Sequence, residues 1–98
     1  MLRIGSIELD MPFIQAPLAG YTDWPMRIIA RRFGAPLTFT GVMLDQIALN
    51  RKALKKKLST TGDEPHPVGA QILGIDPEHM AEAAKVFEAM GFDLIDLN

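Results

Sequence analysis

Short apolar segments alternate along this chain with segments of helical periodicity. The segments with strand character are Pro12–Ala16, Leu37–Met43, Val68–Leu73 and Leu94–Asn98. Apolar residues recur at helical spacing from Thr22 or Asp23 to Gly34, over Gln46–Leu58, and from Asp76 to Gly91. Because strands that alternate with helices are typical of parallel βαβ units, the pattern predicts an α/β fold.

Local signals predict where these elements begin and end. Gly5 and Ser6 separate two short alternating segments, Leu2–Ile4 and Ile7–Leu9, which predicts a hairpin. Asp76 followed by Pro77 and Glu78 is typical of a helix start. A loop is expected over Thr60–Pro67. The first helix is predicted to bury an apolar stripe made of Trp24, Ile28, Ile29 and Phe33.

The predicted elements amount to three and a half βαβ units after the hairpin. A (β/α)8 TIM barrel needs about 250 residues, so residues 1–98 could form the first part of one. An open doubly wound sheet is the alternative, and it would lack its last helix.

Composition limits the class of protein. Of 98 residues, 48% are hydrophobic and 22% charged, which is typical of a globular domain. A net charge of -2 argues against a basic nucleic-acid-binding module. The absence of cysteine excludes disulfides, thiolate metal sites and thiol nucleophiles within these residues. No signal peptide or membrane-spanning run is found, so we expect a soluble, cytoplasmic protein.

Polar residues occur where the predicted parallel strands end, which is where ligands bind in both parallel architectures. Gln71 interrupts an apolar strand, and Asp96 and Asn98 share one face of the last strand. Gln71 either hydrogen-bonds its neighbours within the sheet or offers its amide to a planar heterocycle. Asp96 is interpreted as a paired carboxylate rather than a catalytic one.

The segment from Pro17 to Gly20 forms either a tight turn or a surface for a ligand that approaches the backbone closely. The basic residues of two helices are interpreted as solvated helix ends: Arg27, Arg31, Arg32, Arg51, Lys52 and Lys55–Lys57. Tyr21 and Trp24 are interpreted as packing residues. His66 and His79 have no companion ligands, so no metal site is predicted.

Taken in order, these segments resemble the tRNA-dihydrouridine synthases. Ala16 to Arg27 (APLAGYTDWPMR) is similar to the family signature APMAGxTDxPFR. Further matches are Gly34-Ala35, Pro67 to Gly74 (PVGAQILG), Asp76-Pro77, Met80 to Ala84 and Gly91 to Asn98 (GFDLIDLN). The resemblance covers essentially the whole chain.

The resemblance implies an FMN-binding (β/α)8 barrel followed by a small helical domain. It implies an enzyme that reduces uridine in tRNA to 5,6-dihydrouridine, with NADPH as reductant. Pro17, Leu18 and Ala19 would lie against the flavin, Gln71 would hydrogen-bond it, and Asn98 would lie near the flavin and the target uracil.

Three departures from the family pattern bear on this expectation. The family continues after the asparagine with one residue and Gly-Cys-Pro, whose cysteine is the proton donor, so that donor lies beyond Asn98. Leu18 replaces a methionine, and Gly41 stands where the family commonly has glutamate. We therefore expect the isolated 98 residues to catalyse nothing. Because flavin phosphate binding in such barrels usually comes from loops near strands seven and eight, these residues are also expected to lack a major part of the FMN affinity.

Two alternatives remain open from the sequence. One is another FMN-dependent barrel oxidoreductase, of the dihydroorotate dehydrogenase or old yellow enzyme type. The other is a non-catalytic barrel segment that associates with itself through exposed strand edges.

Overall fold

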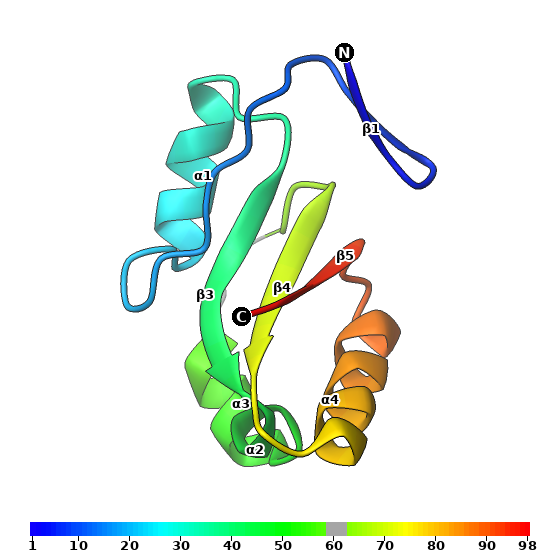
Figure 1. Ribbon diagram of the computed structural model, residues 1–98. Coiled ribbons are helices and arrows are strands. Elements are labelled where there is room, and N and C mark those ends of the chain that lie inside the picture. The colour runs from blue at the N-terminus through cyan, green and yellow to red at the C-terminus, as the bar shows by residue number, and fades with distance from the viewer. Residues whose placement is uncertain (59–62) are drawn as a thin grey trace.

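Three of the four predicted parallel strands form one sheet. The computed structural model describes residues 1–58 and 63–98. Its sheet has the order β3 (Thr38–Leu44), β4 (Val68–Leu73) and β5 (Leu94–Leu97), and both strand pairs are parallel (Figure 1). β4 has a neighbour on each side and is buried except at Leu73. Its apolar run, which Gln71 interrupts, is typical of a central parallel strand.

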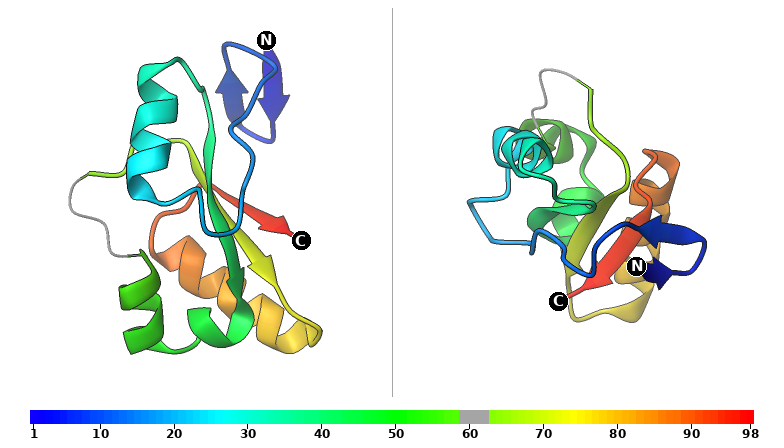
Figure 2. Two further views of the ribbon diagram at one scale, coloured as in Figure 1. Left: turned by 90° about the vertical axis from the view of Figure 1, so that its left-hand side faces the viewer. Right: turned by 90° about the horizontal axis from the view of Figure 1, so that it is seen from above.

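Within the described residues, four helices accompany the sheet: α1 (Trp24–Arg32), α2 (Asp45–Ala48), α3 (Arg51–Leu58) and α4 (Pro77–Ala89). They lie on one side of the sheet, as the left panel of Figure 2 shows. The chain passes from β3 through α2 and α3 to β4, and from β4 through α4 to β5. These are parallel βαβ units, so the predicted α/β class is confirmed.

Helix α4 begins and ends where the sequence predicts. The Asp76 carboxylate accepts a hydrogen bond from the Glu78 backbone N–H at 2.9 Å, and Pro77 occupies the first turn. Gly91 follows the helix with φ +96°, a left-handed conformation that favours glycine. Helix α1 is capped in the same way by Asp23, which accepts from the Met26 N–H at 3.1 Å.

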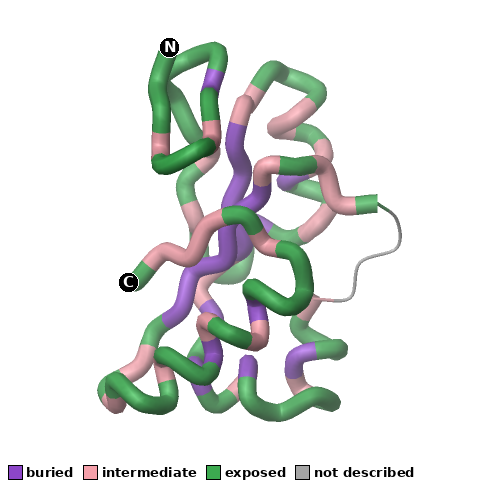
Figure 3. The backbone as a smooth tube through the Cα atoms, turned by 90° about the vertical axis from the view of Figure 1, so that its right-hand side faces the viewer, coloured by how far each residue is buried: buried purple, intermediate pink, exposed green. Residues whose placement is uncertain are grey.

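Two apolar clusters hold the described residues together. The larger one joins β3 and β4 to α2, α3 and α4 around the fully buried Phe87. The smaller one joins Leu9, Leu37 and Phe39 to the hairpin formed by β1 (Leu2–Ile4) and β2 (Ile7–Leu9). The buried stretch of backbone follows β3 and β4 through the centre of the molecule (Figure 3). The hairpin therefore covers the end of the sheet at which its strands begin.

Two predicted elements differ from the structure. Pro12–Ala16 is not a buried strand, because only Gln15 forms a bridge, to Thr38, and Phe13 is 71% exposed. Proline at positions 12 and 17 removes two possible ladder donors. The predicted helix over Gln46–Leu58 is two helices.

The break between those two helices has a local cause. The chain leaves the first helix at Leu49, and the Asn50 side chain then accepts a hydrogen bond from the Ala53 N–H at 2.9 Å. An asparagine that caps a new helix favours a restart over continuation. The predicted loop over Thr60–Pro67 lies partly outside the described residues, and residues 63–67 contain no helix or strand.

Candidate functional site

A bulge in β3 lies opposite Ala70, the residue before Gln71. Phe39 pairs with Gly69 and Val42 with Gln71, so the two residues between them, Thr40 and Gly41, stand opposite Ala70 alone. At this point the Gln71 backbone N–H donates to the Thr40 hydroxyl at 3.3 Å. Bulges are frequent next to active sites, where they redirect side chains.

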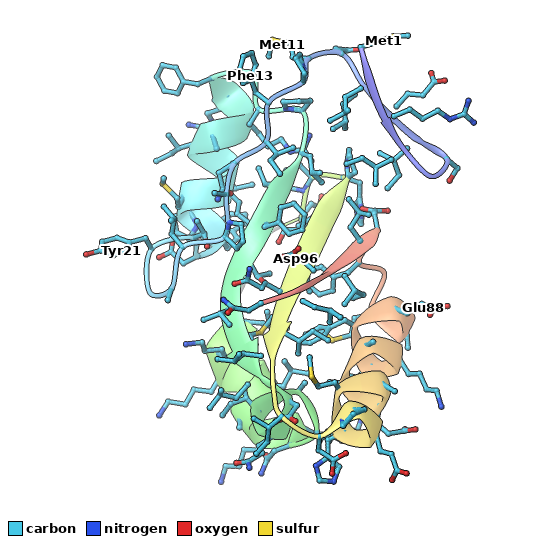
Figure 4. All side chains as sticks on the ribbon, in the orientation of Figure 1. Met1, Met11, Phe13, Tyr21, Glu88 and Asp96 are labelled. Atoms are coloured by element: carbon cyan, nitrogen blue, oxygen red, sulfur yellow. The ribbon has the colours of Figure 1, made fainter. Side chains whose placement is uncertain are left out.

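The three polar residues predicted at the strand ends lie together. The Gln71 Nε2 donates to Asp96 Oδ2 at 2.7 Å, and the Asn98 Nδ2 donates to Gln71 Oε1 at 3.4 Å. Gln71 and Asp96 are register partners in β4 and β5. Gln71 therefore hydrogen-bonds within the sheet, and Asp96 is a paired carboxylate, as interpreted from the sequence. Asp96 lies over the middle of the sheet in Figure 4.

The loop from Leu18 to Thr22 is closed by one hydroxyl. Thr22 Oγ1 accepts from the Leu18 N–H and donates to the Leu18 carbonyl, both at 3.1 Å. The backbone N–H groups of Tyr21 and Thr22 donate to the same carbonyl, and Gly20 has φ +77°. Thr22 is 2% exposed whereas Leu18 is 48% exposed. The loop is thus a tight turn that also presents an apolar side chain outward.

Replacing Thr22 with valine is expected to lower the free energy of unfolding by about 1.5 kcal/mol, because the Leu18 N–H loses its acceptor inside the loop. Serine retains the hydroxyl, so Thr22→Ser should lose less than half as much. Urea unfolding of the three proteins measures both effects. A smaller loss for valine than for serine would mean that the methyl group, and not the hydroxyl, stabilises the loop.

Gly41 connects this loop to the bulge. A Cβ atom placed on Gly41 would lie 3.1 Å from the Leu18 carbonyl oxygen and 3.6 Å from Ala19 Cα. Leu18 and Ala19 thus pack on β3 at the bulge, and the bulge packs on β4 at Gln71. The loop residues Pro17–Ala19 and the amide group therefore lie on neighbouring parts of the sheet, although no hydrogen bond joins them among the described residues. The close approach also explains why this position suits glycine in this chain.

The interpretation of α1 as a helix with an apolar stripe and solvated arginines is correct only in part, since Trp24 and Ile28 are partly buried and Arg32 is exposed. Arg27 is 2% exposed, and its guanidinium donates to Glu64 Oε1 and to the Thr22 carbonyl. Trp24 Nε1 donates to the Asp63 carbonyl at 3.1 Å. Ile29 and Phe33, by contrast, are exposed. The buried face of the helix is the one that carries Trp24, Arg27 and Arg31.

Arg31 binds the backbone just before β3 and just before β4. It donates to the Pro36 carbonyl at 2.7 Å and to the Pro67 carbonyl. Burial lowers the pKa of its guanidinium, an effect that the nearby carboxylates of Glu64 and Asp93 oppose. Together, Trp24, Arg27 and Arg31 tie helix α1 to the segment that leads into β4.

The remaining candidates are simpler. Lys55–Lys57 are exposed at the end of α3, as expected, and Tyr21 points away from the molecule instead of packing (Figure 4). His66 contacts Asp93 at 2.7 Å, and His79 lies 3.6 Å from Asp76. Within residues 1–58 and 63–98, no three His, Cys, Asp or Glu residues could hold a metal ion. No helix in the same ranges is long and apolar enough to cross a membrane.

Among the residues that the structure describes, the site holds no pair arranged for proton transfer. Its groups are two amides, one paired carboxylate and the half-exposed apolar residues Leu18, Leu44 and Leu73. Amides beside apolar surface suit a planar heterocycle whose edge carries both a donor and an acceptor. These residues therefore fit one side of the flavin that the resemblance implies.

Sequence reasoning missed Thr22, Thr40 and Arg27 as residues that shape the site. The helical spacing of Trp24, Arg27 and Arg31 could have identified Arg27, since all three share one face. Nothing in the local sequence distinguishes Thr40 from any other strand threonine.

Comparison with known proteins supports one family. The model of the dihydrouridine synthase (Dus) family matches residues 14–98. A probable tRNA-dihydrouridine synthase of Rickettsia conorii is 39% identical over 100 residues, and the match covers 100% of this chain and 30% of the relative. The tRNA-dihydrouridine synthases B of Pasteurella multocida and Pseudomonas aeruginosa are 38% and 37% identical, with 29% and 30% of each relative covered. The chain thus spans about 30% of the length of the curated relatives it matches.

Proposed function

The chain belongs to the dihydrouridine synthase family, and we propose that it is the amino-terminal part of an enzyme that reduces uridine in tRNA to 5,6-dihydrouridine. The observation that carries this proposal is the hydrogen-bonded amide group of Gln71 and Asn98 at the bulge in β3, next to the Leu18–Ala19 loop. Fold class and site agree with a domain that binds its ligand at the carboxyl ends of parallel strands.

We propose that residues 1–98 form the first units of a (β/α)8 FMN-binding barrel. The matched relatives are about three times as long, since this chain covers 30% of them. The rest of the barrel and a helical tRNA-binding domain would come from the further chain that such relatives contain. β5 has a described neighbour only in β4, which leaves an edge on which a barrel would continue.

In this proposal, Pro17, Leu18 and Ala19 form the apolar surface under the flavin, and Gln71 hydrogen-bonds its edge. Asn98 lies near the uracil, which must leave its base stack to reach the site. When bound, FMN reduced by NADPH supplies a hydride to the uracil ring. The residues named here position the ring and exclude water. The proton donor would be a cysteine outside these residues, which contain none.

Family membership favours this function over another FMN-dependent barrel oxidoreductase, because matches to dihydrouridine synthases cover the whole chain. Since tRNA is the proposed substrate, we propose the cytoplasm as the place of action. Self-association through the β5 edge stays a prediction.

A chimera tests the proposed function. This chain would replace the matching 29% of the Pasteurella multocida enzyme, and the chimera would be expressed in a bacterial strain that lacks dihydrouridine synthases. We expect dihydrouridine in the tRNA by mass spectrometry and FMN in the purified protein by its visible absorbance. The variant Gln71→Leu has a similar size but no amide, and it should bind FMN about tenfold more weakly because one hydrogen bond is lost.

The two measurements separate the possible outcomes. A folded chimera that retains FMN but forms no dihydrouridine would contradict the proposed reaction. Unchanged FMN affinity in the Gln71→Leu chimera would contradict the role of Gln71.

A further inference from the structure

The Gln71 amide lies between two partners of different character. Asp96 accepts from its Nε2 at 2.7 Å, and Asn98 donates to its Oε1 at 3.4 Å. A carboxylate only accepts hydrogen bonds, whereas the amide of Asn98 both donates and accepts. Asn98 could therefore bond to Gln71 in either orientation of the Gln71 amide. Asp96 could not, because a turned amide would place Oε1 against Oδ2.

Orientation decides what Gln71 can offer a ligand. A glutamine amide has two N–H donors and two acceptor positions. Asp96 occupies one donor and Asn98 one acceptor position, so one donor on Nε2 and one acceptor position on Oε1 remain on the same planar group. A turned amide would exchange the donor and the acceptor. A ring edge that fits one orientation would then have its donor facing a donor and its acceptor facing an acceptor.

From this geometry we propose that Asp96 is a positioning residue. Its carboxylate holds the Gln71 amide in one orientation, and so fixes which edge groups the β4 strand presents to the ring. The hydrogen bond is favoured by the register, because Gln71 and Asp96 are direct neighbours on β4 and β5. It is also charge-assisted, which makes it the stronger of the two bonds. Asp96 itself contacts no reacting atom in this role, and the inference rests on the proposed function only for the identity of the ring.

Nuclear magnetic resonance of the ¹⁵N-labelled 98-residue chain tests the orientation without any ligand. We expect a side-chain N–H of Gln71 to exchange with solvent at least about tenfold more slowly than those of the exposed Gln46, which serves as an internal control. Asp96→Ala removes the acceptor. The side-chain N–H exchange rate of Gln71 should then come within about threefold of that of Gln46.

A second variant distinguishes a change of orientation from a loss of folding. Asp96→Asn keeps the shape of the side chain but can both donate and accept, so Gln71 should then populate two orientations and give two sets of side-chain signals. The backbone signals of β4 should stay dispersed in both variants. Slow exchange and a single set of Gln71 signals in both variants would overturn the proposal.

The FMN-binding chimera provides the second readout. Asp96→Asn should weaken FMN binding about tenfold, because a mis-oriented amide loses one hydrogen bond to the ring. Unchanged FMN affinity together with two Gln71 orientations would overturn the claim that orientation matters for the ring. Failure of the unmodified chimera to bind FMN would instead contradict the proposed function and leave the orientation result standing.

Discussion

Replacing Gly69 with alanine is expected to lower the free energy of unfolding by about 2 kcal/mol, the cost of overpacking a close-packed core. A Cβ atom at Gly69 would lie 2.1 Å from Cε1 and 2.4 Å from Cδ1 of the Phe39 ring. That ring is buried in the cluster that also contains Leu9 and Leu37, so it has no free space to move into. The two residues are direct register partners on β3 and β4.

A double-mutant cycle identifies the cause of this loss. Thermal unfolding should show that Gly69→Ala lowers the melting temperature by about 8–16 °C, since 1 kcal/mol corresponds to about 4–8 °C in a domain of this size. Phe39→Leu alone will also destabilise, because it leaves a cavity. The double variant should be more stable than the sum of the two losses predicts, because leucine makes room for the new methyl group. Strict additivity would show that the clash is not the cause.

The elements that were predicted correctly are those whose signals are local. Asp76 and Gly91 mark the ends of α4 because a cap needs only a side chain and its own backbone within a few residues. The strand Val68–Leu73 was predicted to the residue, because a buried central strand is rich in apolar residues. The hairpin around Gly5 was also predicted correctly from local signals.

The elements that were predicted wrongly depend on distant parts of the chain. Pro12–Ala16 has strand composition, but a strand also needs a partner, and only Gln15 has one, at Thr38. The apolar stripe assigned to α1 included Ile29 and Phe33, which are exposed. The face that is buried instead carries arginines, because Glu64 and backbone carbonyls far along the chain supply their partners.

The candidate site divides in the same way. Gln71, Asp96 and Asn98 could be placed on one surface from the sequence, because the two-residue period of a strand and the parallel order of the sheet fix it. Which of them bond to one another could not be predicted, since that depends on the register between β4 and β5. The bulge at Thr40 and Gly41 is a further register effect with no local signal.

Removal of the Arg27 side chain is expected to have the largest effect of the substitutions considered for this chain. Its guanidinium contacts Glu64 Oε1 through Nε at 2.9 Å and Nη2 at 2.5 Å, and its Nη1 donates to the Thr22 carbonyl at 2.8 Å. Breaking a buried ion pair costs about 3–5 kcal/mol, because the remaining charge keeps its desolvation cost without a partner. Arg27→Met should therefore lose about 3 kcal/mol, near the lower bound, since Glu64 is only partly buried.

Matched variants on the same helix separate the ion pair from helix propensity. Arg32 is exposed, so Arg32→Met should change the unfolding free energy by less than about 0.5 kcal/mol in urea. Arg27→Lys retains the charge but not the planar guanidinium that donates through several N–H groups. Its stability should lie between those of Arg27→Met and the unchanged chain. Adding Glu64→Gln to Arg27→Met should recover part of the loss, because the unpaired charge is then removed as well. If Arg27→Met and Arg32→Met destabilise equally, the contacts to Glu64 and Thr22 do not hold helix α1 to the segment before β4.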